Sequence, residues 1–380
     1  MIYLNQAATT YPKPNCVHKA VQAYLSDAPA SQFRGNLRDQ VDFMTKTRKN
    51  IGEIIGTQNW EQIYFTSGAT ESANALLRGL DFKSKDILVT QTEHNSILRP
   101  LFNMDKFNPN QIKIVPCETD GMVTVEAIKN SLTKNSTAII INHCSNVTGC
   151  IQNLENISRF AKEHGLFLLV DASQSAGCMP IHTDKLLLDA VIFTGHKGLL
   201  GLPGTGGFYI RDQKLLKPFI YGGTGRNSAQ LLYKDDFEFE VGTQNMPGIA
   251  ALCASTSYLL ERGISAIQKE EQRLMQKLYE GLKALEHVVL YRDFDDRQGP
   301  VLSMNINGVK ASDVGYILSE GYQITVRCGL HCSPLIHKAM HTLEDGTVRI
   351  SISCMTTEEE IDAVIFAITQ IVDSYYPIHS

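Results

Sequence analysis

The sequence predicts an α/β protein: a large domain with a mostly parallel sheet, joined to a smaller α+β domain. From about residue 60, short β-rich runs alternate with helical stretches. Several of these runs are apolar at successive positions, which indicates strands that helices cover on both faces. After Pro247 the pattern changes to a long helical stretch followed by shorter strands and helices, which indicates the second domain.

The expected elements follow this alternation. In the large domain we expect a helix at 70–80 and strands at 62–65, 87–90, 112–115, 138–142, 166–170, 190–193 and 207–210. In the smaller domain we expect a helical stretch over 249–285 broken near Gly263, strands at 301–305, 323–326 and 348–351, and helices at 312–319 and 357–375. We place the large domain at 16–250 and the smaller one at 251–380, together with residues 1–15.

Composition narrows the class of protein. The chain has 380 residues, 43% hydrophobic and 20% charged, which is typical of globular proteins and too long for one core. A net charge of -5 gives no reason to expect nucleic acid or an anionic membrane as a partner. No apolar run approaches the roughly 18 residues of a membrane helix, and the N-terminus lacks signal-peptide features. Nine scattered cysteines indicate free thiols, so we expect a soluble, cytoplasmic protein.

Lys197 is the first candidate for chemistry. In parallel α/β sheets ligands bind beyond the carboxyl ends of the strands, and Lys197 follows the apolar strand at 190–193 in Thr194-Gly195-His196-Lys197-Gly198. A lysine in such a place readily lowers its pKa, as an imine-forming amine requires. A solvated loop lysine is the structural alternative.

Asp171 stands at another strand end, in Val170-Asp171-Ala172-Ser173-Gln174. An enzyme that uses pyridoxal phosphate (PLP) needs a carboxylate beside the pyridinium nitrogen, so that the ring withdraws electrons. Asp171 fits that role by type and position, and Gln174 could donate to the phenolic oxygen of the ring. The alternative is that Asp171 caps the following helix.

Two further segments lie at strand ends. Thr66-Ser67-Gly68-Ala69-Thr70-Glu71 is a strand-to-helix turn, whose backbone N–H groups suit a phosphate, although Ser67 or Thr70 could simply be an N-cap. We assign Ala69 and Thr70 to cofactor binding. His94 follows the strand at 87–90 and could stack on a flat ring and handle protons, or be a structural histidine.

These elements, in this order, resemble the class V aminotransferase family, and within it the cysteine desulfurases and selenocysteine lyases. The resemblance covers nearly the whole chain, and its motifs are Asn5-Gln6-Ala7-Ala8-Thr9-Thr10, Glu93-His94-Asn95, Ser145-Asn146-Val147-Thr148-Gly149, Gly195-His196-Lys197, Phe239-Glu240-Val241-Gly242-Thr243 and Arg327-Cys328-Gly329-Leu330-His331-Cys332, together with the Asp171 and Ser67 segments. It implies the PLP-dependent aminotransferase-like fold (fold type I), with PLP as cofactor and no metal.

The resemblance also implies roles for single residues. Lys197 would be the Schiff-base lysine, Asp171 the pyridinium partner, Gln174 a neighbour of the phenolic oxygen and His94 the residue over the ring. Thr70, Thr194 and His196 would hold the phosphate, and Thr243 would reach the phosphate of a second subunit, which implies a homodimer. Asn146, beside the cofactor, Arg327 and Arg349 would bind the substrate, whose carboxylate a guanidinium can hold through two hydrogen bonds.

Cys332 would be the nucleophile that takes sulfur from the substrate as a persulfide, with Arg327 and His331 favouring its thiolate. The alternative is a small buried hydrophobe. The segment 327–332 is compact, as in the desulfurases that pass sulfur to an acceptor protein. Cys328 resembles a packing residue or a resolving thiol. Two departures are Asn5-Gln6 in place of the family's Asp-Asn, which bears on the substrate, and Thr194 in place of serine.

The expected function is therefore a PLP-dependent cysteine desulfurase that converts L-cysteine to L-alanine, or a selenocysteine lyase. Another class V enzyme, such as a different C–S lyase or an aminotransferase, is the alternative, and Cys332 discriminates because a transaminase has no use for a loop thiol. A non-catalytic scaffold is a third reading, against which Lys197, Asp171 and His94 together argue.

Overall fold

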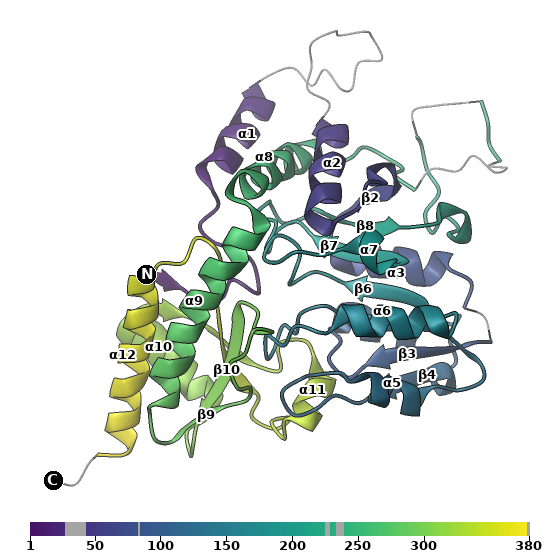
Figure 1. Ribbon diagram of the computed structural model, residues 1–380. Helices are drawn as coiled ribbons and strands as arrows, with labels where there is room; N and C mark the ends of the chain where they lie inside the picture. Colours follow the sequence, from purple (N-terminus) through teal and green to yellow (C-terminus); the bar gives the residue numbers. More distant parts are fainter. Residues whose placement is uncertain (27–42, 83, 225–228, 233–238, 378–380) are drawn as a thin grey trace.

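The computed structural model describes residues 1–26, 43–82, 84–224, 229–232 and 239–377, and two sheets organise it (Figure 1). The larger sheet has the strand order β2-β8-β7-β6-β5-β3-β4. Its strands are β2 (Ile63–Thr66), β3 (Asp86–Thr90), β4 (Ile112–Val115), β5 (Ser136–Asn142), β6 (Phe167–Asp171), β7 (Ala190–Thr194) and β8 (Gly206–Ile210). Only β8 runs antiparallel to its neighbours, so the predicted mostly parallel sheet is confirmed.

Helices cover both faces of this sheet, which explains the continuous apolar strands. Along β5, Ile139 and Ile141 join one apolar cluster, while Ala138 and Ile140 join another on the opposite face. The helices of this part are α1 (Asn15–Ser26), α2 (Phe43–Ile55), α3 (Ala69–Gly79), α4 (Asn95–Asn103), α5 (Val125–Ser131), α6 (Leu154–Glu163), α7 (Thr183–Leu186) and α8 (Met246–Arg262), with 3-10 turns at Trp60–Gln62, Pro109–Gln111 and Gln213–Leu215.

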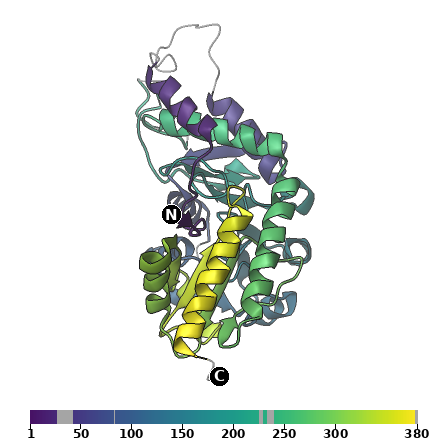
Figure 2. The same cartoon turned by 90° about the vertical axis from the view of Figure 1, so that its left-hand side faces the viewer.

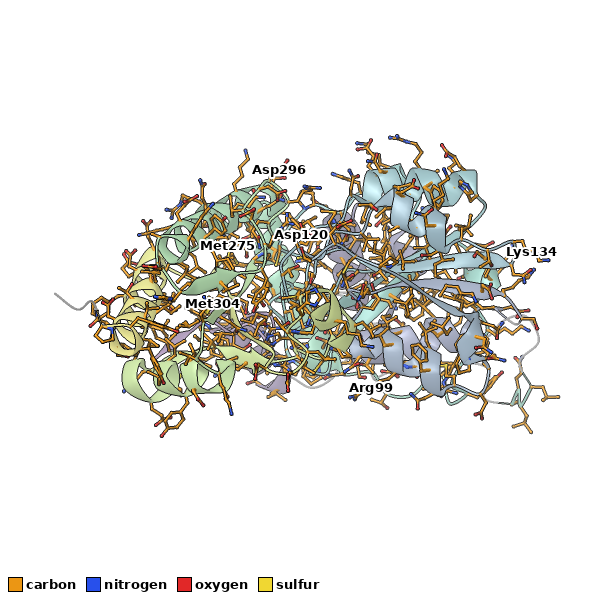
Figure 3. The ribbon with its side chains drawn as sticks, turned by 90° about the horizontal axis from the view of Figure 1, so that it is seen from below. Arg99, Asp120, Lys134, Met275, Asp296 and Met304 are labelled. Atoms are coloured by element: carbon orange, nitrogen blue, oxygen red, sulfur yellow. The ribbon has the colours of Figure 1, made fainter. Side chains whose placement is uncertain are left out.

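A smaller unit follows, built on a sheet of order β12-β13-β10-β9. Its elements are α9 (Ile264–Lys283), β9 (Val288–Leu290), β10 (Val301–Ile306), α10 (Ala311–Tyr322), β12 (Arg327–Gly329), α11 (Pro334–Ala339), β13 (Thr347–Ser351) and α12 (Glu358–Tyr375). Helices α9 and α12 lie side by side on this sheet (Figure 2). Its apolar core includes Met275 and Met304, which lie inside this unit, away from Lys134 at the far end of the molecule (Figure 3).

The N-terminal segment joins this smaller unit by backbone pairing. β1 (Ile2–Tyr3) pairs in parallel with β11 (Ile324–Thr325). The strand expected at 323–326 is present as the shorter β11, and a further strand that was not predicted, β12, pairs with β13 after Val326. Placing a domain boundary at residue 250 stays a prediction; α8 crosses that residue and packs on α1 and α2.

Candidate active site

A cavity of about 370 Å³ opens at the carboxyl ends of β5, β6 and β7, between the two sheets. That volume suits a small cofactor. The cavity brings together most of the residues predicted from the sequence: Ala69, Thr70, His94, Asn146, Asp171, Gln174, Thr194, His196, Lys197, Arg327 and Arg349. Cys332 and Thr243 do not line it.

Lys197 comes three residues after the end of β7, and its backbone is anchored from the N-terminal segment. The Thr10 hydroxyl donates to the carbonyl oxygens of His196 and Lys197, at 3.1 and 3.2 Å. Burial, reinforced by the charges of Arg349 and Arg327, lowers the pKa of the Lys197 amine to about 8, although the nearby Asp171 opposes this shift. A substantial neutral fraction near physiological pH is what an imine-forming lysine needs.

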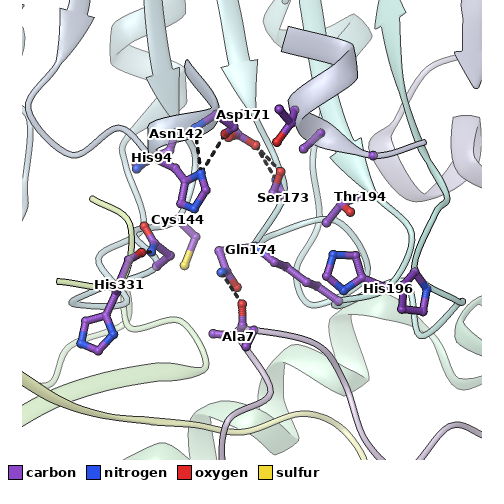
Figure 4. A pocket seen from close by; sticks show the side chains of 18 of the residues that line it. Ala7, His94, Asn142, Cys144, Asp171, Ser173, Gln174, Thr194, His196 and His331 are labelled. Carbon is purple, nitrogen blue, oxygen red and sulfur yellow. Dashed lines mark hydrogen bonds between the residues drawn. The ribbon is translucent and has the colours of Figure 1, made fainter. Parts of the chain in front are cut away.

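Asp171 is the last residue of β6, and a local turn fixes its carboxylate. Its Oδ1 accepts from the Ser173 amide at 2.9 Å and from the Ser173 hydroxyl at 2.5 Å (Figure 4). Gln174 faces the same cavity and donates through Nε2 to the Ala7 carbonyl at 3.0 Å. The N-terminal segment therefore forms one wall of the site.

His94 combines the two roles considered for it. Its Nδ1 accepts from the Ser96 amide at 3.0 Å, so it caps α4, and its ring also lines the cavity. Burial, with the nearby charge of Lys197, lowers the pKa of His94 to about 4. The ring is neutral at physiological pH, as suits stacking on a flat aromatic group.

The turn before α3 forms the opposite end of the cavity. Gly68 is the N-cap of α3, and Glu71 accepts from the Ser67 amide at 2.7 Å. A side chain on Gly206 of β8 would approach the Gly68 Cα within 2.5 Å, so the turn rests directly on the sheet. Thr70, Thr194 and His196 surround this end, and burial lowers the pKa of His196 to about 4. Hydroxyls and helix N–H groups, rather than an imidazolium, are therefore the donors offered to a phosphate.

Two arginines of the smaller sheet close the site. Arg349 of β13 donates to the Asn146 carbonyl at 2.9 Å and to Asn5 Oδ1 at 3.1 Å. Arg327 lies opposite it on β12, and its Nη2 contacts Cys332 Sγ at 3.3 Å. The Cys332 thiol thus lies at the border of the cavity beside a permanent cation.

The loop that carries Cys332 is firmly held. His331 and Cys332 have φ of 51° and 60°, in the left-handed region that costs a non-glycine residue roughly 1 kcal/mol or more each. The side-chain amide of Asn146 donates through Nδ2 to the His331 carbonyl at 2.7 Å, and its Oδ1 accepts from the Ser333 hydroxyl at 2.7 Å. The Asn95 amide donates to the Cys332 carbonyl at 2.7 Å. These contacts impose the strained turn and fix where the thiol lies.

His331 and Cys328 have roles other than that of a partner for the Cys332 thiolate. Burial lowers the pKa of His331 to about 2, and its Nε2 lies 3.1 Å from the Thr347 carbonyl oxygen. His331 is therefore neutral, and the expectation that it assists the thiolate by its charge is wrong; Arg327 is the cation at the sulfur. Cys328 packs against Gly315 of α10, and burial raises its pKa to about 11, which indicates a packing role.

Sequence reasoning gave no role to two groups near the cavity. Glu93 is buried, and burial, with the charge of Asp171, raises its pKa to about 8. Cys144 lines the cavity, and burial raises the pKa of its thiol. Glu93 precedes His94 within the Glu93-His94-Asn95 motif, and that adjacency was the available signal. Cys144 follows the apolar run of β5 and gives none.

The remaining observations concern the described residues as a whole. Thr243 is exposed and outside the cavity of its own chain, so its role toward a second subunit stays a prediction. Across the described ranges, no cluster of three or more His, Cys, Asp or Glu side chains is arranged to hold a metal ion. In that same part of the chain, no helix has the length and apolar character to cross a membrane.

Comparison with known proteins gives consistent matches. The family model described as Aminotransferase class-V matches residues 2–364. A relative from Methanothermobacter thermautotrophicus, named "Probable cysteine desulfurase", is 32% identical and covers 95% of this chain and 92% of its own. One of the same name from Pyrococcus abyssi is 31% identical, with coverages of 98% and 95%. The apo structure of a cysteine desulfurase from Thermococcus onnurineus NA1 has a TM-score of 0.84 at 29% identity, covering 98% of this chain and 95% of that one.

Proposed function

Since the chain belongs to the aminotransferase class-V family, we propose that it is a PLP-dependent cysteine desulfurase that converts L-cysteine to L-alanine and takes the sulfur onto Cys332. The observation that carries this proposal is the contact of Arg327 Nη2 with Cys332 Sγ at 3.3 Å, at the border of a cavity that also holds Lys197 and Asp171. An aminotransferase needs no thiol there. The fold-type-I likeness expected from the sequence agrees with the solved desulfurase structure.

The residues of the cavity fit PLP. Lys197 offers an amine of lowered pKa, Asp171 a carboxylate for a ring nitrogen, and the turn at Thr70 donors for a phosphate. Gln174, Ala69, Thr194 and His196 complete the wall. When bound, PLP supplies an electron sink for the electron pair left at the substrate Cα.

Side chains of this protein carry out the separate steps of the reaction. Arg349 binds the substrate carboxylate and so directs the side chain toward the cysteine loop. Lys197 Nζ takes the Cα proton as a general base. The Cys332 thiolate attacks the substrate sulfur, so a sulfur–sulfur bond forms as the Cβ–S bond breaks, and protons returned to carbon complete alanine. Cys332 is left as a persulfide.

The same proposal includes several finer features. L-selenocysteine is cleaved by the same groups, since selenium leaves carbon more easily than sulfur. The persulfide is handed to an acceptor protein, because the fixed loop keeps Cys332 at the border of the cavity, partly exposed, where a second thiol can reach it. The enzyme is a cytoplasmic homodimer, in which the exposed Thr243 serves the partner's phosphate end.

The decisive experiment compares two thiols. Cys332→Ala should keep PLP and lower the rates of sulfide and alanine release from L-cysteine by about three orders of magnitude, because the nucleophile is gone. Cys328→Ala, one strand position from Arg327 but packed against Gly315, is the matched control and should stay active.

The opposite results have clear meanings. If Cys328→Ala loses activity and Cys332→Ala keeps it, the assigned nucleophile is wrong. If neither change matters, the enzyme forms no persulfide, and another class V activity, a different C–S lyase or an aminotransferase, takes the place of this proposal.

A further inference from the structure

Arg349 carries a positive charge in the interior of the protein. Its side chain is 1% exposed, and the two acceptors of its hydrogen bonds, the Asn146 carbonyl and Asn5 Oδ1, are neutral oxygens. Its Nε finds no acceptor among the described residues. Buried guanidinium groups are usually paired with a carboxylate, because an unpaired charge in the interior is costly. Within the described chain, no carboxylate forms an ion pair with Arg349.

A second cation adds to this cost. Arg327 is the cross-strand partner of Arg349, and like charges placed opposite each other destabilise a sheet. Arg327 turns its Nη2 to the Cys332 sulfur, not to an acid. Burial, followed by the charge of Arg327, lowers the pKa of Arg349 to about 9. An anion that enters beside Arg349 therefore relieves both the burial of its charge and the repulsion between the two arginines.

Asn5 is the side chain that decides whether this charge stays uncompensated. It forms a backbone bridge with Ser351 of β13, and the Ala7 amide donates to the Ser351 hydroxyl at 2.9 Å, so its position is fixed by the backbone. Since a guanidinium only donates, the Asn5 oxygen must face it. An aspartate has the same shape and would form an ion pair in the same place. The neutral amide keeps the hydrogen bond without supplying the charge.

We propose that Asn5 is a specificity-determining residue that, by staying neutral, reserves the buried charge of Arg349 for the α-carboxylate of an incoming amino acid. This inference rests on the proposed function for its ligand class, but it concerns binding and not sulfur transfer. Asn5 acts through Arg349 and contacts no reacting atom. An acid at position 5 would compete with the substrate for the guanidinium.

The test uses two ligands that differ only in the carboxylate. L-alanine and L-alaninamide are titrated into PLP-loaded enzyme, and dissociation constants are taken from the change in visible absorbance. Asn5→Asp should weaken L-alanine by about tenfold or more and leave L-alaninamide within about twofold of the parent. Asn5→Ser, which removes the amide without adding charge, is the matched control and should affect L-alanine far less than Asn5→Asp does.

Each other outcome overturns the inference. If Asn5→Asp weakened the binding of both ligands equally, the role of Asn5 would be merely structural. If L-alanine binding were unchanged, the aspartate would not compete with the ligand for Arg349. If the parent enzyme bound neither ligand, or bound both equally, Arg349 would not form a carboxylate-binding site. If L-alanine binding behaves as expected while the parent enzyme releases no sulfur from L-cysteine, the proposed function fails and the role of Asn5 stands.

Discussion

Single side chains in and around the cavity are tuned mainly by burial, and Glu93 is the clearest case. Its Oε1 accepts from the Thr90 hydroxyl at 2.7 Å and from the Asn142 amide at 2.6 Å, while its Oε2 has no partner among the described residues. Burial is the main reason why its pKa rises from 4.5 to about 8, and the charge of Asp171 adds to it. The protonated acid beside Asp171 avoids placing two negative charges together.

The Glu93→Gln variant tests this protonation. A carboxyl whose pKa is higher in the folded chain stabilises the fold fully below about pH 4.5 and loses that contribution as the pH rises to about 8. The Tm of apo Glu93→Gln should match the parent near pH 4.5 and exceed it by about 2–5 °C at pH 8.5. Glu163→Gln, on the exposed end of α6, is the control. A Tm difference that shrinks as the pH rises would contradict the assignment.

Lys197→Ala tests the cofactor site directly. Removal of the Lys197 amine should leave the far-ultraviolet circular dichroism unchanged, because the backbone of residue 197 still accepts from Thr10. The visible absorbance of lysine-bound PLP and borohydride trapping should both disappear. Mass spectrometry of the borohydride-treated variant is the check, and PLP fixed to another lysine would refute the role of Lys197.

Which properties of a site residue can be predicted from the sequence depends on whether they arise from neighbours along the chain or from distant segments. Asp171 and Lys197 could be found because both follow apolar strands, and the structure brings them into one cavity. The neutrality of His331 could not, because it depends on burial beneath β13. The Asn146 contacts with the cysteine loop are equally hidden, since they join residues 146 and 333.

Helices and strands match the sequence-based predictions where the predictive residues lie within or beside the element itself. Gly263 separates α8 from α9 as predicted, because its φ of 81° suits glycine. The strand expected at 323–326 forms as β11, but β12 was not predicted, because it pairs with β13 from a later segment of the chain. A strand of three residues is too short to show the alternation that would reveal it.

The last helix, α12, offers a test of an N-terminal cap. Thr357 accepts from the Glu360 amide at 3.3 Å, and Glu360 accepts from the Thr357 amide at 3.0 Å, which forms a capping box. Thr357→Ala should lower the free energy of unfolding by about 1 kcal/mol, and Thr357→Ser should restore most of it. Guanidinium denaturation followed by circular dichroism measures both, and equal stability of the alanine and serine variants would exclude the cap.

At the scale of the whole molecule, the exposed Thr243 leads us to expect a site shared between two subunits. Thr243→Ala homodimers should bind PLP more weakly, and Lys197→Ala homodimers should trap none. In a mixed dimer of the two variants one site is intact, so about one PLP per dimer should be trapped by borohydride at limiting PLP. Differently tagged chains allow this dimer to be purified. A mixed dimer that binds PLP as weakly as Thr243→Ala homodimers would contradict the sharing, as would a monomeric holoenzyme.

The pairing of β1 with β11 has a consequence for biosynthesis. Residues 2 and 3 leave the ribosome long before their partners, 324 and 325. At about 5–20 residues per second, the N-terminal strand waits roughly 16 to 65 s for its partner. Asn5, which accepts from Arg349, cannot take its final place earlier. The nascent chain can therefore build its large sheet well before it can hold a substrate.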